Sequence, residues 1–456
     1  MLIKQEHSLI YAVLIACASW ACSPTSVPDY VLISGTVTQS NSSYLTIKGD
    51  YFSTDIDRNS NGTFSDTLRV ARGFYTFYCG SEKAQIFLDK GYVLHLSANQ
   101  SQFNNTLFFS GKGTGTKVNN YLANKSRFEN TLTSDQILYS YNETDFERQV
   151  KGWSDQVLKL LQVSEIVDID FVSQEKRNIT YTYLTHISHY EKYHQHATQD
   201  YNYTVSADFE KPLEQLDMSN EQDFENLSSY RNLLKSYIGS RIERGQTTAT
   251  FESIKANTTQ LIKTELILEL VRKINIGQKN VEQIYQGILN LSPDSTTLAG
   301  LNDKMNKIRK LNQGMPSPPF AYKDITNQII SLTDLRGKYI YMDIWATWCH
   351  PCLKEIPALK TLQERYNDTL IEFVSLSIDA NKDFSKWQDM VKNKELKGIQ
   401  LFADQSWNSI FLKDYIIETI PRFILIDPNG NIINAHAPRP SNPETRSILD
   451  GLLHKS

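Results

Sequence analysis

The stretch that decides the fold is DIWATWCHPCLKEIP, residues 343–357, in which two cysteines stand two residues apart behind a tryptophan. An apolar run leads into the pair, and a run with helical spacing follows it. Three interpretations of Cys349 and Cys352 are open: a redox pair, half of a zinc site, or two structural thiols. The sequence around the pair discriminates among them.

Strand-like and helix-like runs alternate around this stretch. The strand-like runs are KYIYMDIWA, LIEFVSLSID, IQLFA, RFILID and NIINAHA, and the helix-like runs are residues 351–366, FSKWQDMVKN, SWNSIFLKDY and NPETRSILDGLLH. This alternation predicts an α/β domain over residues 314–456, with a mostly parallel sheet between helices. The DPNG turn at 427–430 predicts that the last two strands form an antiparallel hairpin.

The position of the cysteine pair between a strand and a helix favours the redox interpretation. Cys349 would lie at a helix N-terminus, where free N–H groups and the helix dipole stabilise a thiolate. Cys352 follows one turn later, close enough for a disulfide within the motif. A zinc site would need a second ligand pair, and the sequence has neither a second CxxC nor, after the first, a His pair at finger spacing. A disulfide across so short a loop would constrain little of the unfolded chain.

This region resembles the thioredoxin fold and, within it, the exported TlpA/ResA-like thiol-disulfide oxidoreductases. The stretch SLTDLRGKYIYMDIWATWCHPCLKEIPALKTL carries the resemblance, which covers residues 314–456. It implies that Cys349 is the attacking thiol and Cys352 the resolving thiol. The redox-active disulfide between them would do the chemistry without an organic cofactor or a metal.

The resemblance also assigns Asp343 and Pro421 to the catalytic site. Asp343 matches a buried acid that helps to move the proton of the resolving thiol, and burial should raise the pKa of such a carboxyl. Pro421 matches a cis-proline whose loop lies against the disulfide. A cis bond there would expose the backbone of Ile420 to a substrate strand.

Four residues beside the cysteines are predicted to be auxiliary: Trp348, His350, Pro351 and Glu355. Glu355 matches the acid that commonly follows the motif in TlpA-like proteins. An ordinary solvated helix residue is an equally good interpretation of this position. His350 departs from the usual residue between the cysteines, and its imidazole would favour the thiolate and make the pair more oxidising.

Two further departures bear on mechanism. Ser375 stands where the lysine partner of the buried acid would fall, so the proton route through Asp343 is expected to differ. Thr419 replaces a glycine that is frequent two residues before the cis-proline, which alters the expected substrate groove. A peroxiredoxin, on the same fold, would have a Thr three residues before a lone Cys, whereas Thr347 is two before Cys349 and a second Cys follows.

The composition excludes some classes of protein. The chain has 456 residues, enough for about three domains. It is 40% hydrophobic and 21% charged, with a formal net charge of −4 and no clustered basic excess of the kind that nucleic-acid binding needs. Five cysteines, only two of them close together after the leader, are too few for a disulfide framework.

Residues 1–22 read as a signal peptide or lipoprotein leader, because their apolar run is too short to span a bilayer. The tetrapeptide LIAC resembles a lipobox and makes Cys17 the predicted lipid anchor, with Cys22 as the alternative. An uncleaved apolar N-terminus remains the plain interpretation. The expected location is the cell envelope, lipid-anchored and facing the periplasm, where disulfides form and turn over.

Residues 28–112 are predicted to be an all-β domain, since short runs rich in Val, Ile, Thr, Tyr and Phe alternate with turn clusters. The expected architecture is a small antiparallel sandwich or barrel. Cys79 lies in one of the strand-like runs and is interpreted as a buried small hydrophobe.

Residues 115–312 are predicted to be an all-α middle domain, because apolar residues recur there at helical spacing. One stretch gathers His186, His189, His194 and His196. A metal site is conceivable there, but no Cys or suitably spaced acidic residue completes it, so an aromatic-rich packing or interface helix is favoured. The segment GMPSPPF, 314–320, is interpreted as an extended linker.

The whole arrangement resembles multi-domain lipoproteins of Bacteroidetes. It predicts an exported enzyme that exchanges disulfides with envelope proteins, with reduction as the favoured direction. The resemblance implies a membrane electron donor of the DsbD or CcdA type, and cytochrome c maturation as one family precedent for the substrate. The alternative is an envelope ligand-binding or scaffold lipoprotein with an ancillary redox module.

Overall fold

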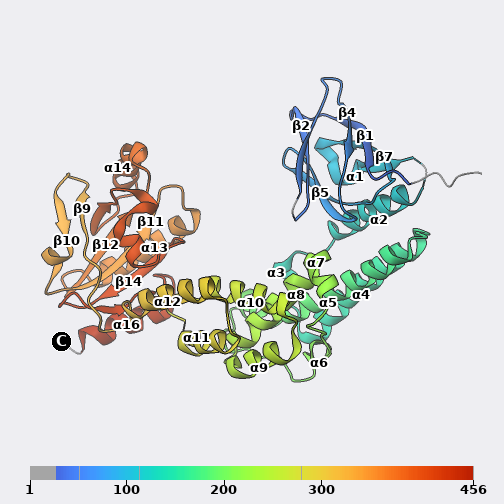
Figure 1. Ribbon diagram of the computed structural model, residues 1–456. Helices are drawn as coiled ribbons and strands as arrows, with labels where there is room; N and C mark the ends of the chain where they lie inside the picture. The colour runs from blue at the N-terminus through green and yellow to red at the C-terminus, as the bar shows by residue number, and fades with distance from the viewer. Residues whose placement is uncertain (1–26, 51, 112, 279, 455–456) are drawn as a thin grey trace, which may run out of the picture. The chain divides into compact units, whose positions relative to one another are not determined.

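The computed structural model describes residues 27–50, 52–111, 113–278 and 280–454 (Figure 1). The predicted leader, with Cys17 and Cys22, lies outside the described residues. The chain forms two compact units, the first running to Glu214 and including residues 222–233, and the second holding residues 215–221 and everything from Leu234 onward. The division between units therefore runs inside the helical region, and the predicted domain ranges remain a proposal.

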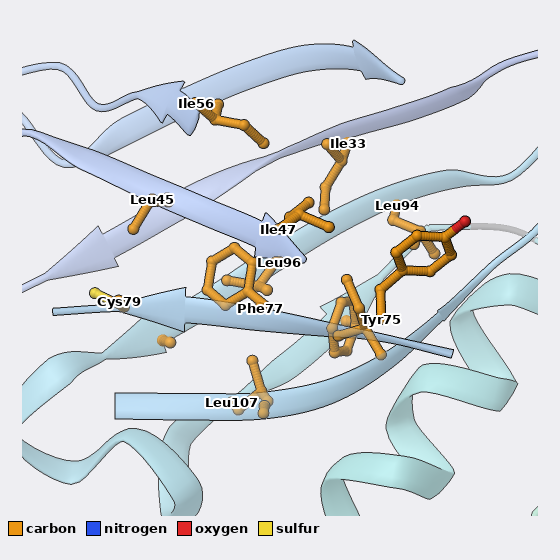
Figure 2. Packing of buried hydrophobic residues seen from close by; sticks show 14 of the residues in the cluster. Ile33, Leu45, Ile47, Ile56, Tyr75, Phe77, Cys79, Leu94, Leu96 and Leu107 are labelled. Atoms are coloured by element: carbon orange, nitrogen blue, oxygen red, sulfur yellow. The ribbon is translucent and has the colours of Figure 1, made fainter. Parts of the chain in front are cut away.

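The first unit begins with two four-stranded sheets, ordered β4-β1-β7-β8 and β3-β2-β5-β6. The strands are β1 (Val31–Thr38), β2 (Tyr44–Lys48), β3 (Ser53–Asp57), β4 (Thr63–Leu68), β5 (Gly73–Cys79), β6 (Glu82–Leu88), β7 (Val93–Asn99) and β8 (Phe108–Ser110). One short helix, α1 (Phe103–Thr106), precedes β8. Side chains from both sheets share one hydrophobic core, so the sheets form a sandwich (Figure 2).

The alternation of apolar and polar residues explains this packing. In β1 every second residue is buried, and Ile33 belongs to the same core as Ile47 of the opposite sheet and Leu96 of β7 (Figure 2). Cys79 is also buried in this cluster, with its Sγ 3.5 Å from the Ser40 hydroxyl, in agreement with its interpretation as a small hydrophobe.

One detail of this domain differs from the prediction. The sandwich is not wholly antiparallel, because β1 runs parallel to β7 while pairing antiparallel with β4. The chain crosses between the two sheets several times before β7 pairs with β1. No hairpin joins these two strands, so none forces them to be antiparallel. Between β6 and β7 the chain turns at Gly91, which takes a φ of +78°.

Helices occupy the rest of the first unit and cross into the second. They are α2 (Thr114–Glu129), α3 (Asp135–Leu138), α4 (Glu143–Val163), α5 (Ile169–Thr198), α6 (Lys211–Glu214), α7 (Glu221–Asn226) and α8 (Ser228–Glu243). Helix α2 is fastened to the sandwich by Asn119, whose buried amide accepts from the Phe87 N–H at 2.8 Å and donates to the Phe87 carbonyl at 2.9 Å. An aromatic cluster of Phe87, Tyr121 and Phe171 lies beside this contact.

The histidine-rich stretch forms part of α5 and packs against aromatic rings. His194 is buried between Tyr190 and Tyr203, and its Nδ1 lies 2.8 Å from the Tyr139 carbonyl. His186 Nδ1 lies 3.1 Å from the Tyr139 hydroxyl. No group of three or more His, Cys, Asp or Glu side chains suited to a metal ion occurs among the described residues. These contacts support the packing interpretation of the stretch.

The second unit contains helices α9 (Thr247–Asn257), α10 (Gln260–Lys273), α11 (Val281–Asn290) and α12 (Ser295–Arg309), followed by an α/β domain. That domain has a seven-stranded sheet in the order β10-β9-β13-β12-β11-β14-β15. Its strands are β9 (Ala321–Asp324), β10 (Ile329–Ser331), β11 (Tyr339–Trp345), β12 (Ile371–Ser377), β13 (Ile399–Phe402), β14 (Arg422–Ile426) and β15 (Ile432–Asn434). Its helices are α13 (His350–Arg365), α14 (Phe384–Asn393), α15 (Ile410–Asp414) and α16 (Pro443–Leu453).

The sheet is mixed, so the prediction of a mostly parallel sheet is wrong. Only β11, β12 and β13 run parallel, and β9, β10, β14 and β15 pair antiparallel with their neighbours. Two strands joined by a helix are parallel only if the helix returns the chain to the end of the sheet where the first strand began. Strand β14 instead enters beside β11 in the opposite direction. The DPNG turn then makes the predicted antiparallel hairpin with β15.

The segment at 314–320 is extended, as predicted, but it is part of the domain rather than an independent linker. The Gly314 N–H donates to the Ile432 carbonyl at 2.7 Å, and the Ser317 N–H donates to the Gly430 carbonyl at 3.0 Å. Phe320 is buried against Phe411. Prolines remove only their own donors, so the other residues of this segment remain able to pair with the β14–β15 hairpin.

No helix within the described part of the chain combines the length and the apolar character needed to cross a membrane.

Replacing Asn119 by Ala should loosen the attachment of α2 to β6, because two backbone groups of Phe87 lose their partner in a buried place. The cost is about 2–3 kcal/mol. Amide hydrogen exchange of residues 82–88 should accelerate by about one to two orders of magnitude.

The control for that experiment is Asn124→Ala, an exposed position on the same helix, where the expected change is within about 0.5 kcal/mol. Unchanged protection of β6 in the Asn119 variant would contradict the assignment.

Candidate functional site

The predicted redox pair lies where β11 ends and α13 begins. Cys349 is the N-cap residue of α13, and the Cys352 N–H points at its Sγ from 3.2 Å. The two cysteines form a disulfide, with Cα atoms 5.3 Å apart. After reduction, the same N–H and the helix dipole would stabilise a thiolate on Cys349.

The auxiliary residues surround Cys349 at the surface. His350 and Pro351 occupy the first turn of α13 and are exposed. Trp348 is 49% exposed, and its ring centroid lies 6.4 Å from that of Trp407, which is also exposed. Cys349 itself is only 4% exposed. An incoming disulfide therefore reaches a recessed sulfur beside two indole rings.

A buried acid that sequence reasoning missed holds the loop before the pair. Asp379 is fully buried and accepts hydrogen bonds from the Thr347 N–H at 2.9 Å, the Thr347 hydroxyl at 2.7 Å and the Ser377 hydroxyl at 2.8 Å. These bonds fix the turn that delivers Cys349 to the helix end. The available signal in the sequence was an acid at the end of the apolar run LIEFVSLSID, a position where a strand leaves the core.

Asp343 lies on β11 beneath α13, and burial raises the pKa of its carboxyl to about 7. The Ser375 hydroxyl donates to its Oδ1 at 2.5 Å, which opposes the shift but does not cancel it. Ser375, which stands where the family pattern has a lysine, is thus the hydrogen-bond partner of the buried acid. A carboxyl with such a pKa exchanges protons readily near neutral pH.

The structure brings Asp343, Cys352, Glu355 and Pro421 together around one small cavity of about 20 Å³. Cys349 lies at the outer side of the disulfide, and Cys352 lines the cavity itself. The predicted resolving thiol and the predicted buried acid therefore share one enclosed space.

The Ile420–Pro421 peptide bond is cis, at the position that the sequence predicts. Pro421 is half-buried and lines the cavity, and Ile420 is half-buried just before it. Thr419, which replaces the more frequent glycine, is exposed. This loop therefore lies against the disulfide side of the domain.

Glu355 has partners that favour a structural role. It is 8% exposed, and its carboxylate accepts from the Ser441 N–H and the Ser441 hydroxyl, both at 3.0 Å. Arg439 lies 3.9 Å away. Glu355 thus fastens the segment before α16 to α13, and the interpretation as a solvated helix residue is wrong because this segment covers it.

Replacing Asp343 by Asn should stabilise the oxidised protein at pH 8. A folded-state pKa raised to about 7 means that the native chain loses stability as the pH rises from about 4 to about 7, while the carboxyl ionises more easily in the unfolded chain. Asn resembles the protonated acid, so the gain is on the order of 4 kcal/mol above pH 7 and vanishes below pH 4.

Urea unfolding of both proteins at pH 4 and pH 8 measures this difference. Asp389→Asn, at an exposed position on α14, is the control and should leave stability nearly unchanged. A gain that is equal at the two pH values would contradict the burial of an ionisable Asp343.

Part of the second unit is similar in sequence to known proteins. Residues 312–453 match the family model described as Redoxin. A thiol-disulfide oxidoreductase ResA of Bacillus cereus is 30% identical over 146 residues, which are 32% of this chain and 79% of that protein. The thioredoxin-like protein YneN of Bacillus subtilis strain 168 is 28% identical over 140 residues, which are 31% of this chain and 80% of that protein.

Solved structures from Bacteroides also align with this region. One is the solution structure of a Bacteroides vulgatus protein proposed to be a thiol-disulfide oxidoreductase, 48% identical, covering 32% of this chain and 94% of that one, with a TM-score of 0.29. Another is a thiol-disulfide oxidoreductase from Bacteroides fragilis NCTC 9343, 25% identical, covering 30% of this chain and 99% of that one, with a TM-score of 0.27.

The ResA match covers 79% of that relative. The residues matched by the Redoxin model, 312–453, include the CxxC disulfide, the buried acid and the cis-proline. Through this C-terminal domain of thioredoxin fold, the chain belongs to the family of ResA-type thiol-disulfide oxidoreductases.

Proposed function

We propose that this protein is an exported thiol-disulfide oxidoreductase that acts on envelope proteins through Cys349 and Cys352, chiefly as a reductase. The observation that carries the proposal is the disulfide at the N-terminus of α13, with Cys352 facing the same cavity as Asp343. That arrangement supplies an activated outer thiol and a proton acceptor for the inner one.

The catalytic cycle begins with the reduced pair. The Cys349 thiolate attacks one sulfur of a substrate disulfide, which breaks that bond and releases one substrate thiolate. A mixed disulfide now joins Cys349 to the substrate. Asp343 accepts the proton of Cys352, and the Cys352 thiolate attacks the Cys349 sulfur and releases the second substrate thiolate. Two electrons have passed to the substrate, and the structure shows the oxidised enzyme that results.

The surrounding backbone is arranged to hold the substrate during this exchange. The cis-proline loop at Ile420–Pro421 supports the docking of an extended substrate strand, which would pair with the Ile420 backbone. The Trp348 and Trp407 rings provide an apolar surface for the side chains next to the substrate cysteine.

The cycle needs a donor that returns two electrons to the Cys349–Cys352 disulfide, and the proposed donor is a membrane protein of the DsbD or CcdA type. No organic cofactor or metal takes part in the proposed cycle. The proposed location is the periplasmic side of the cell envelope, with the chain anchored by lipid on Cys17 or Cys22. Apoproteins awaiting haem attachment, as in cytochrome c maturation, are one substrate class that such an enzyme would serve.

A second candidate function is the binding of an envelope ligand by the first unit. A cavity of about 660 Å³ lies there between the outer face of β5 and β6 and the helices. Tyr78, Asn178, His186 and Tyr193 are among the polar and aromatic side chains that line it. Its size is within the range of small-molecule sites.

A double variant, Cys349→Ser with Cys352→Ser, separates the two functions. The reductase proposal expects complete loss of disulfide exchange in a growth or maturation assay of envelope proteins. If the double variant functions like the wild type in that assay, the result would support the ligand-binding function and contradict the proposal.

The single variant Cys352→Ser should stall the cycle after the first step, because no second thiol remains to resolve the mixed disulfide. Substrate proteins should therefore accumulate on Cys349 as adducts that migrate slowly on non-reducing gels and disappear after dithiothreitol treatment. Cys349→Ser is the matched control and should trap nothing. Equal trapping by the two variants would sink the assignment of Cys349 as the attacking thiol.

A further inference from the structure

A row of polar side chains crosses three central strands under α13. Asp343 of β11 is paired in register with Ser375 of β12, and Ser375 with Gln400 of β13. Residues paired in this way point to the same face of a sheet. All three are buried, although this face otherwise packs apolar side chains against α13 and α16. Buried polar groups in such a place need hydrogen-bond partners.

Two buried polar atoms, one in this row and one beside it, have no hydrogen-bond partner among the described residues. Gln400 donates from Nε2 to the Lys397 carbonyl at 2.7 Å, but its buried Oε1 accepts nothing. The indole Nε1 of Trp345, two residues after Asp343 on the same face, is buried and donates to nothing. Leaving one such atom unpaired costs about 1–3 kcal/mol. An unpaired acceptor and an unpaired donor thus lie near the same acid.

Both residues line the cavity that holds Asp343 and Cys352. Its volume of about 20 Å³ is suited to a single water molecule, and a buried water requires two to four polar partners. Gln400 Oε1 would accept a hydrogen bond from such a water, and Trp345 Nε1 would donate one to it. The Asp343 carboxyl, whose Oδ1 already accepts from Ser375, offers a further oxygen.

The cavity also leads toward the surface. Its lining runs from Cys352 and Pro421 at one end to half-buried Leu396 and exposed Lys397 at the other. The cavity that Cys352 lines therefore extends toward the exposed side chain of Lys397. No lysine side chain is in the position next to the acid, where Ser375 stands.

We propose that Gln400 and Trp345 hold a relay water that passes the proton of Cys352, once it is on Asp343, to solvent on the Lys397 side. Gln400 is a positioning residue in this scheme, and Ser375 orients the carboxyl that receives the proton. The proton moves from the Cys352 thiol to the Asp343 carboxylate and then to the water, with no change in the electron count. This inference rests on the proposed function of the Cys349–Cys352 pair.

The decisive variant is Gln400→Met, which keeps the length of the side chain and removes its acceptor. Gln363→Met is a closely matched control, because Gln363 is buried, lines the same cavity and donates to the same Lys397 carbonyl at 3.0 Å. Both variants lose that bond, but only Gln400 has a buried Oε1 without a hydrogen-bond partner among the described residues. Their unfolding midpoints should therefore fall by similar amounts.

The measurement is the rate at which the full chain resolves a preformed mixed disulfide on Cys349, followed by stopped flow between pH 5 and 9. In the wild type the rate should rise with the ionisation of Asp343. Without the relay water the carboxylate is less well solvated, so its titration moves to higher pH. The Gln400 variant should be about tenfold slower at pH 7, with its profile displaced upward by about one pH unit.

The control variant should keep the wild-type profile. A Gln400 profile that overlays that of the Gln363 variant would overturn the relay while leaving the redox function intact. If the wild-type chain resolves no mixed disulfide at all, the proposed function fails and the relay fails with it.

A crystal structure of the oxidised chain provides an independent readout. The relay requires a water within hydrogen-bond distance of both Gln400 Oε1 and Trp345 Nε1. Electron density that instead shows the cavity closed by side chains would also overturn the inference.

Discussion

The burial of one carboxyl group, that of Asp343, is the constraint on which the redox site depends. An acid in the core of a sheet costs free energy when it ionises, and its pKa of about 7 expresses that cost. The hydrogen bond from Ser375 partly offsets this cost, and the carboxyl lines the same cavity as Cys352. The ionised carboxylate thus lowers stability at neutral pH, and in the proposed cycle the same carboxylate accepts the proton of Cys352.

The rest of the domain positions two sulfurs relative to that acid. Asp379 fixes Thr347, which sets the turn before Cys349, and α13 begins at Cys349 itself. Glu355 holds the segment before α16 through Ser441. These acids have different tasks although all three are buried: Asp343 is paired with a single hydroxyl and shares a cavity with Cys352, whereas Asp379 and Glu355 are consumed by hydrogen bonds that organise loops.

Much of this domain could be predicted from sequence because its signals are local. The helix FSKWQDMVKN, the DPNG hairpin and the CxxC at a strand–helix junction each follow from residues close together in the chain. Strand direction, the pairing of 314–320 with β15 and the parallel β1–β7 pair depend on contacts between distant residues, which a single sequence does not display. Gln400 escaped notice for the same reason, since only the register of β12 and β13 brings it beside Ser375.

The reduction potential of the Cys349–Cys352 couple, measured on the purified chain by equilibration in glutathione and dithiothreitol buffers, tests the central claim most directly. The account predicts a reversible two-electron couple near the value of thioredoxin, about −270 mV, as a reductase requires. A value near that of DsbA, about −120 mV, would contradict the reductase direction and point to His350 as the cause. The absence of any reversible couple would contradict the enzymatic account itself.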